Sequence, residues 1–344
     1  MKQYVFTIII VLITLTSNAQ IGGDRIYRFL DLPNSARQAA LGGNQIAVFD
    51  DDPDMIYHNP SLLNELMHNH LAFNYVNYLS DIMYGYAAYC RTYNNAGTFA
   101  LGIHYVDYGD FPYVPEEATA PIGTFTAKEY SFNISYSRLI NSNFNAGATL
   151  KPVFSSLETY KSFGLLLDLG ATYISNNKNL TTSLLFKNIG GQITTYYEGA
   201  EREDVPFDIQ LGLTYKLKHA PIRLLATAQH LTDWNIRYEK QSTDELTQES
   251  SSGNLIDKAF NHFTVGAELF PIRNFTIRLG YNHLRKKELS LEDMPSTVGL
   301  SWGFGFKISK FNLSYGSAKY HLAGASNHFS ISVNLSEFSS MSRR

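Results

Sequence analysis

The feature that most constrains this chain is a strict alternation of apolar residues with small or polar ones, repeated in run after run. Examples are FDIQLGLTYKL from residue 207, FTVGAELF from 263 and FTIRLGY from 275. Because successive side chains of a strand point to opposite faces, each run puts an apolar surface on one side and a small or polar one on the other. The pattern therefore predicts long amphipathic strands.

Fourteen such strands are predicted, starting near residues 69, 81, 96, 128, 143, 162, 178, 204, 221, 258, 273, 294, 310 and 327. They are longer than the mean soluble strand of about 5 to 6 residues and reach the roughly 9 to 11 residues that cross a bilayer. The prediction is an all-β fold, a 14-stranded antiparallel transmembrane β-barrel over residues 69–338. The run TVGLSWGFGFKI, with Val298 and Trp302 on its apolar face, fits a curved wall that has glycine opposite.

The spacing between the strands supports this count. Short polar turns such as YNN, NSN, NNK and PIRN follow even-numbered strands, while the longest connections, near 107–127, 189–203 and 232–257, follow odd-numbered ones. Bacterial barrels have short periplasmic turns and longer outward loops in this order. A soluble exported β-sandwich or propeller also alternates and remains the alternative.

The first residues predict export. Lys2 precedes an apolar run that is too short for a membrane-spanning helix, and Ser17 and Ala19 form a small-residue cleavage site. Residues 1–19 are therefore predicted to be a signal peptide, and the outer membrane is the expected location. The single Cys90 leaves the exported chain without an internal disulfide. A net charge of -3 lacks the basic surplus that favours nucleic acid as a partner.

The stretch DLPNSARQAALGGNQIAVFDDDPDMIYHNPSLL, residues 31–63, precedes the first strand. It has no complete phosphate-binding motif. Asp50, Asp51, Asp52 and Asp54 could supply calcium ligands, but the run has no EF-hand spacing and Pro53 interrupts it. A solvated or hydrogen-bonded acidic turn is therefore the preferred interpretation. No cofactor or metal is expected.

A plug suits this position better. Small residues such as Ala39, Gly42 and Gly43 allow close packing against an inner wall, while Pro60 restricts Asn59 to an extended backbone. Residues 20–68 are therefore predicted to form an N-terminal hatch inside the barrel. A disordered periplasmic tail is the alternative.

Catalytic motifs are not found. The chain contains neither G-x-S-x-G nor H-E-x-x-H, and its histidines are scattered, so an enzyme is not expected. Lys216, Glu268 and Arg278 fall on the face predicted to line the lumen, where charges commonly pair across the bore.

The order Ser-Ala-Arg, Gly-Gly, Asp-Asp and Asn-Pro ahead of 14 strands resembles the FadL-type outer-membrane family, whose N-terminal hatch carries a DDA…NPA motif. Ser61 stands where that family usually has Ala. The predicted hatch residues are Ser35, Ala36, Arg37, Gly42, Gly43, Asp50, Asp51, Asp52, Asn59 and Pro60.

Within that family, the stretch is most similar to the PorQ and PorV type of barrel from the type IX secretion system. This resemblance implies a surface-anchoring role. The implied partners are a PorZ-like surface protein, a PorU/PorV-type attachment complex and lipopolysaccharide. A FadL-like transporter of hydrophobic molecules, with the hatch as its gate, is the alternative.

The loop near 107–127 offers candidate contacts for such a partner. Tyr108, Phe111, Tyr113 and Val114 could serve as anchors, while Pro112 and Pro115 limit flexibility. A loop that folds over the barrel mouth is an equally open interpretation.

Overall fold

The computed structural model describes residues 25–94, 96–114, 120–233, 255–289, 297–321 and 324–339. The predicted signal peptide, 1–19, and most of the predicted loop 232–257 lie outside these ranges. No helix in the described residues is long and apolar enough to cross a membrane.

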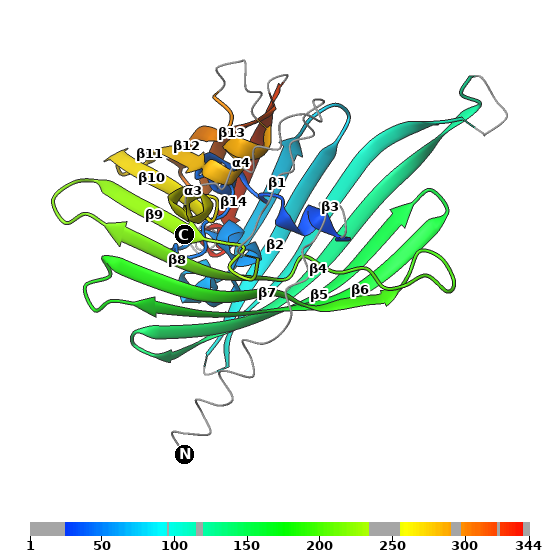
Figure 1. Ribbon diagram of the computed structural model, residues 1–344. Coiled ribbons are helices and arrows are strands. Elements are labelled where there is room, and N and C mark those ends of the chain that lie inside the picture. Colours follow the sequence, from blue (N-terminus) through cyan, green and yellow to red (C-terminus); the bar gives the residue numbers. More distant parts are fainter. Residues whose placement is uncertain are drawn as a thin grey trace.

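The strands close into one antiparallel barrel in which each strand pairs with its neighbours in sequence and β1 pairs with β14 (Figure 1). This confirms the predicted 14-stranded fold. The strands are β1 His70–Asn77, β2 Met83–Tyr93, β3 Gly97–Tyr113, β4 Gly123–Asn141, β5 Phe144–Leu157, β6 Tyr160–Ile174, β7 Leu180–Thr194, β8 Asp208–Lys216, β9 Ile222–Ala228, β10 Phe263–Ile272, β11 Phe275–Asn282, β12 Leu300–Ile308, β13 Phe311–His321 and β14 Gly324–Asn334.

The apolar face of each strand points outward. Leu101, Ile134, Leu211, Leu279 and Trp302 are each about half exposed on the outer surface, and the intervening residues are buried. A band of exposed large apolar side chains around a closed sheet suits lipid and not water. The alternation was therefore interpreted correctly, and the apolar face is not the inner face of a soluble sandwich.

Two predicted positions are wrong. Val298 was assigned to the outer face, but it is buried because it lies in the turn before β12 begins. Lys216 was assigned to the lumen, but it is exposed because it is the last residue of β8.

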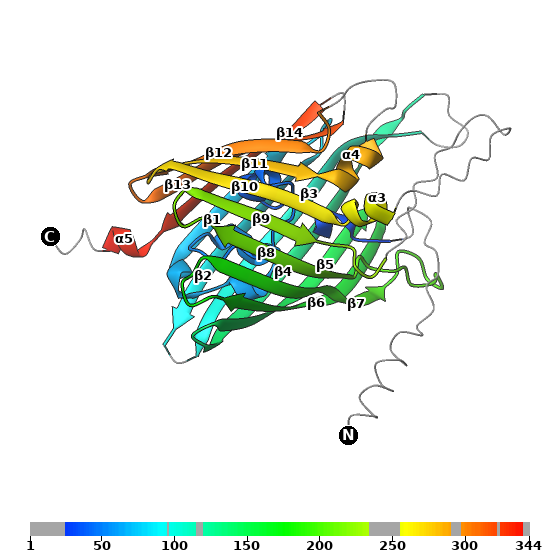
Figure 2. The same ribbon diagram turned by 60° about the vertical axis from the view of Figure 1, so that its left-hand side comes forward.

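The two ends of the barrel differ. We call the end that carries the connections β2–β3, β4–β5, β6–β7, β8–β9, β10–β11 and β12–β13 the turn end, and the opposite end the loop end (Figure 2). The predicted loops 107–127 and 189–203 sit at the loop end but are partly strand, since β3 extends to Tyr113, β4 starts at Gly123 and β7 extends to Thr194. The loop-end connection after β5 is also very short, like the one after β1.

The N-terminal segment fills the lumen. It enters at the loop end, where the backbone N–H of Ile26 donates to the carbonyl of Asp204 between β7 and β8 (3.0 Å), and it reaches the turn end before β1. Its elements are η1 Arg28–Asp31, α2 Ala36–Ala40, η2 Pro53–Tyr57, η3 Pro60–Leu62 and η4 Glu65–Met67. Outside it are α3 Leu255–Phe260, α4 His283–Leu289 and α5 Ser336–Ser339.

Helix α2 starts at a polar cap and packs against the wall through small residues. Ser35 accepts a hydrogen bond from the N–H of Gln38, which satisfies one of the free donors at the helix start. A Cβ added to Gly280 of β11 would lie 2.2 Å from the N atom of Gly42. One added to Gly303 of β12 would lie 2.6 Å from Cβ of Ala40. Glycine on the wall therefore lets the hatch backbone approach the strands closely.

Gly280→Val tests this close approach. The new side chain meets hatch backbone that cannot rotate away, so we expect the hatch to be displaced at a cost of about 1–3 kcal/mol, typical of overpacking. Amide hydrogen exchange of residues 36–47 should rise. Gly191→Val in β7 is the matched control, because a Cβ there has no atom within 4 Å. Equal protection in both variants would contradict the packing argument.

Candidate functional site

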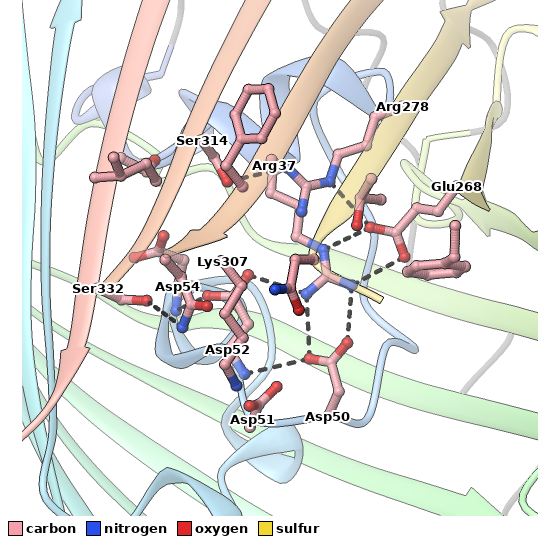
Figure 3. Close-up of a pocket in the computed structure, with 18 of the residues that line it drawn as sticks. Arg37, Asp50, Asp51, Asp52, Asp54, Glu268, Arg278, Lys307, Ser314 and Ser332 are labelled. Atoms are coloured by element: carbon pink, nitrogen blue, oxygen red, sulfur yellow. Dashed lines mark hydrogen bonds and ion pairs between the residues drawn. The ribbon is translucent and has the colours of Figure 1, made fainter. Parts of the chain in front are cut away.

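One hatch arginine lies at the centre of a buried ionic network inside the barrel. Arg37 is 5 % exposed, and its guanidinium forms ion pairs with Asp50 (2.8 Å), Asp52 (2.9 Å) and Glu268 (2.8 Å). Asp50 and Asp52 belong to the hatch, whereas Glu268 belongs to β10 (Figure 3). Arg37 thus folds the acidic run back onto α2 and also ties it to the wall.

Two wall arginines complete this network. Arg223 of β9 reaches Asp50 (2.9 Å) and Glu268 (2.8 Å), and Arg278 of β11 donates to Glu268 (3.1 Å). Glu268, fully buried, therefore meets three guanidinium groups. A buried charge is tolerated when it is paired and hydrogen-bonded, so this network accounts for a carboxylate inside the wall. The prediction that Glu268 and Arg278 face the lumen is confirmed, but they pair between the adjacent strands β10 and β11 and not across the bore.

The remaining acids of the run divide into two kinds. Asp51 is exposed, while Asp54 is buried and accepts a hydrogen bond from the Asn74 side chain of β1 (2.6 Å). Asp52 caps η2 by accepting from the N–H of Asp54. The acids thus serve as caps and ion-pair partners, in agreement with the predicted hydrogen-bonded acidic turn. Among the described residues no His, Cys, Asp and Glu group is arranged to hold a metal ion.

The pKa values of Asp50 and Asp54 shift in opposite directions. Burial tends to raise the pKa of Asp50, but Arg37 and Arg223 outweigh it and hold that pKa below its usual range. Burial and the neighbouring Asp52 raise the pKa of Asp54 well above its usual range. Asp50 is therefore stabilised as a carboxylate, whereas ionising Asp54 costs free energy.

Asn59 and Pro60 lie where the hatch meets β5 and β6. The Asn59 amide donates to the carbonyl of Ile46 (2.8 Å), and its oxygen accepts from the N–H of Ser61 (3.0 Å). A Cβ on Gly147 of β5 would lie 2.4 Å from the Pro60 oxygen. The Asn-Pro pair thus closes an internal loop of the hatch and packs this loop against the barrel wall.

A second ionic group ties the other side of the hatch. Lys187 of β7 donates to the carbonyl of Leu30 (3.1 Å) and to Asp31 (2.9 Å). Beside it Lys151 of β5 pairs with Asp168 of β6, and both are fully buried. None of the wall residues Lys151, Asp168, Lys187 and Arg223 was singled out from the sequence, although each is a charge on an inward position of an alternating strand.

The loop end of the lumen contains the largest buried apolar cluster among the described residues. Tyr27, Phe29 and Leu30 of the hatch are buried there against wall residues that include Tyr84 and Val106. The Tyr27 hydroxyl is 2.5 Å from Oγ of Ser162. An apolar molecule that entered from the loop end would meet this cluster first.

Within the part of the chain that the structure describes, the hatch borders cavities at three places. One of about 270 Å³ lies beside the Arg37 network and one of about 160 Å³ lies among polar residues near Lys187 and Arg285. The third, about 500 Å³, lies at the turn end between η4 and the β2–β3, β4–β5 and β6–β7 turns.

The candidate partner residues do not form a loop. Tyr108, Phe111 and Tyr113 lie in β3, and Val114 directly follows it. Tyr108 packs against the apolar cluster and donates to Glu129 (2.5 Å), so it faces the barrel interior and not a partner. Phe111 stacks on Phe125 across the hairpin (5.3 Å between ring centroids).

These features define the class. A closed antiparallel barrel with an apolar outer band, a polar inner face and an N-terminal hatch tied inside by ion pairs is a plugged transmembrane β-barrel of outer-membrane type.

Solved structures share this architecture. The toluene transporter TbuX of Ralstonia pickettii is 12% identical, with a TM-score of 0.52 over 88% of this chain and 97% of that one. The toluene transporter TodX of P. putida is 13% identical (0.52; 89% and 99%), and a FadL homologue of Pseudomonas aeruginosa is 12% identical (0.50; 88% and 98%). No protein-family model and no curated protein matches the chain. The chain therefore has the fold of the FadL-type outer-membrane barrels.

The opposite pKa shifts give a pair of variants with opposite expected behaviour. Asp50→Asn should lose about 1–3 kcal/mol of hatch stability near neutral pH, because it leaves arginines short of a partner. That deficit should shrink as the pH falls through the lowered pKa of Asp50, where the wild type loses the same carboxylate. Hydrogen exchange of residues 36–67, corrected for its intrinsic pH dependence, measures both effects.

Asp54→Asn is the matched partner. The raised pKa of Asp54 means that the wild-type hatch gains stability as this carboxyl protonates on acidification. The amide keeps an acceptor for Asn74 without the charge, so the variant should equal or exceed the wild type above neutral pH and lack the acid gain. A similar loss in both variants would contradict the assigned roles.

Proposed function

We propose that this chain is an outer-membrane channel for small hydrophobic molecules, with the hatch as its gate. The observation that carries the proposal is the closed 14-stranded barrel around a wall-bound hatch, which aligns over 88% of the chain with toluene transporters. In the expected orientation the turn end faces the periplasm and the loop end faces outward.

The distribution of side chains supports a gate at the hatch. The apolar cluster around Tyr27, Phe29 and Leu30 sits at the loop end, where a hydrophobic molecule would arrive. Between this cluster and the turn end lies the Arg37 network, which joins the hatch to β9 and β10. Passage along the lumen requires the hatch to move, and loosening the network would make that movement easier.

Uptake of labelled toluene by cells that express the chain tests the channel. Uptake should be saturable and faster than in cells with the empty vector. Arg37→Met should raise it further, because a loss of about 1.4 kcal/mol of hatch stability increases the open population tenfold. Arg28→Met is the control, since this hatch arginine is exposed and its ion pair with Asp31 is long (4.0 Å). If the wild type and Arg37→Met are both present in the membrane and neither takes up toluene faster than cells with the empty vector, the channel is rejected.

A second candidate function is the PorQ-like anchor that holds a PorZ-like surface protein for a PorU/PorV-type attachment complex and lipopolysaccharide. One observation favours it. The β3–β4 hairpin extends past its neighbours at the loop end (Figure 1) and exposes Tyr113, Val114 and Ile122. β2 pairs with β3 only as far as Asp107, so residues 110–113 have no β2 partner along that edge. A surface protein could pack on these side chains or add a strand there.

Crosslinking in intact cells, followed by mass spectrometry, tests the anchor. The triple variant Phe111→Ser, Tyr113→Ser and Ile122→Ser should reduce recovery of the surface partner at least tenfold, since truncating an anchoring aromatic costs about 2 kcal/mol. The control is Tyr160→Ser with Tyr197→Ser, an exposed ring pair elsewhere at the loop end (4.5 Å). Unchanged recovery from the triple variant rejects this hairpin as the anchoring surface.

A further inference from the structure

The six hairpins of the turn end carry charge of one sign. They comprise residues 89–99, 136–146, 172–182, 214–222, 269–277 and 305–313, and their sequence contains no Asp or Glu. Their Lys and Arg residues, which we call the basic rim, are Arg91, Arg138, Lys178, Lys216, Lys218, Arg273, Lys307 and Lys310. All of them except Lys310 are exposed. The turn end of the wall therefore presents a set of cations to its surroundings.

The basic rim is not neutralised by the chain itself. In the part of the chain that the structure describes, none of its cations forms an ion pair with a carboxylate. Inside the barrel, by contrast, Lys151 and Lys187 each pair with an acid. The acids Asp51, Glu65 and Glu337 are exposed at the turn end, but they are outnumbered by the rim. An excess of positive charge remains there.

The loop end has the opposite bias. The connection after β7, residues 195–207, contains one base, Arg202, against Glu198, Glu201, Glu203 and Asp204. The connections after β1 and β5 contain one acid each, Asp81 and Glu158, and no base. Summed charge of this kind attracts anions to one end of a molecule and repels them from the other. A negatively charged partner is therefore favoured at the turn end.

Two rim arginines point outward, toward the lipid that surrounds the wall. In β2, Arg91 follows Tyr89 on the outward-facing side, and in β4, Arg138 follows Tyr136 in the same way. Both arginines lie beside the apolar band at its turn-end edge. A long cationic side chain at such an edge can keep its apolar stem in the hydrocarbon and its charge among the headgroups.

Aromatic rings between these two arginines indicate the same depth. Phe99 of β3 pairs with Arg91 on one side and with Tyr136 on the other. The ring of Phe99 lies 4.9 Å from that of Tyr136 and 5.8 Å from that of Tyr93, and the Arg91 guanidinium lies 5.6 Å from the Tyr93 ring. Membrane barrels carry aromatic girdles of this kind at the membrane–water interface. Arg91 and Arg138 thus flank an aromatic group at headgroup depth.

We propose that the basic rim binds anionic phospholipids and gathers them around the turn end. Lipid phosphates meet Arg91 and Arg138, and the adjoining acyl chains pack on the rings of Phe99 and Tyr136. The recognised headgroup carries a net negative charge, as in phosphatidylglycerol, because the amine of a zwitterionic headgroup opposes the cations. A lipid suits the two arginines better than an acidic protein does, since both side chains face the apolar band and not the space beyond the barrel.

Native mass spectrometry of the full chain in detergent tests the preference. Dioleoyl phosphatidylglycerol and dioleoyl phosphatidylcholine are added separately, and the bound lipids are counted. Half saturation should need at least tenfold less phosphatidylglycerol than phosphatidylcholine, because each cation near an anionic surface raises affinity about fivefold. A higher ammonium acetate concentration should weaken this preference by screening. Equal binding of the two lipids overturns the proposal.

Matched variants assign the preference to the two arginines. Arg91→Gln with Arg138→Gln should raise the phosphatidylglycerol needed for half saturation at least tenfold. Arg91→Lys with Arg138→Lys should keep most of the preference, since the charge remains. Lys128→Gln with Lys161→Gln is the control, because it removes equal charge from the outer face near the loop end. Gel migration before and after heating checks that each barrel is folded. An equal loss in the control overturns the assignment to the turn end.

Photolabelling locates the lipid. Phosphatidylglycerol that carries a diazirine in its headgroup should label residues 89–99 and 136–146 in the wild type and lose this label in the double Gln variant. Label without enrichment at these residues overturns the site. If crosslinking in intact cells captures an acidic periplasmic protein at Arg91 and Arg138, and the purified barrel shows no lipid preference, the lipid is rejected as the occupant.

The inference does not depend on the channel. A preference for phosphatidylglycerol without toluene uptake keeps the basic rim as a lipid site and rejects the proposed channel. Toluene uptake without a lipid preference keeps the channel and rejects the lipid site.

Discussion

The ion pairs between Arg37 and Glu268 are the interaction on which the interior of this barrel depends. They join the hatch to β10 in a part of the lumen where both groups are almost fully buried. Neither charge could stay there alone, because an unpaired buried charge costs several kcal/mol. The fold therefore requires the hatch and the wall to meet in one register, and Arg223 and Arg278 extend that requirement to the strands on either side.

The hatch is held by two kinds of contact with different physical properties. On the β11–β13 side, glycines and alanines let backbones meet, and uncharged hydrogen bonds join them, such as that from the N–H of Gly42 to Ser301 (3.1 Å). Around Arg37 and Lys187 the contacts are ionic and directional. Packing of small residues varies little with pH, whereas the ionic contacts respond to protonation and to solvent entry. The parts of the hatch that are paired with β7, β9 and β10 are thus the parts that conditions can loosen.

The barrel could be predicted from sequence because its signal is local. A period of two identifies the lipid face, and shifting a strand by one residue would expose its polar side to lipid. The position of the hatch could also be predicted, from the small residues and the Asn-Pro pair that precede β1 in the sequence. Which charges meet could not be predicted, because Arg223 and Asp50 are brought together by the closure of the sheet, and no local pattern encodes that.

Pro112 was interpreted as a loop residue, yet β3 continues through it. It lacks a β2 partner, so its missing N–H costs no ladder bond on that side.

The two candidate functions make opposite demands on the same contacts. A channel needs hatch contacts weak enough to break at each passage, so selection would keep the network near the limit of stability. An anchor gains nothing from such weakness, since its loop-end hairpin works on a rigid barrel. The acidic run includes both Asp50, which is stabilised as a carboxylate, and Asp54, a buried acid whose ionisation costs free energy. The proposed channel can use the second, because a group whose ionisation costs free energy in the closed hatch brings the open and closed states closer in free energy.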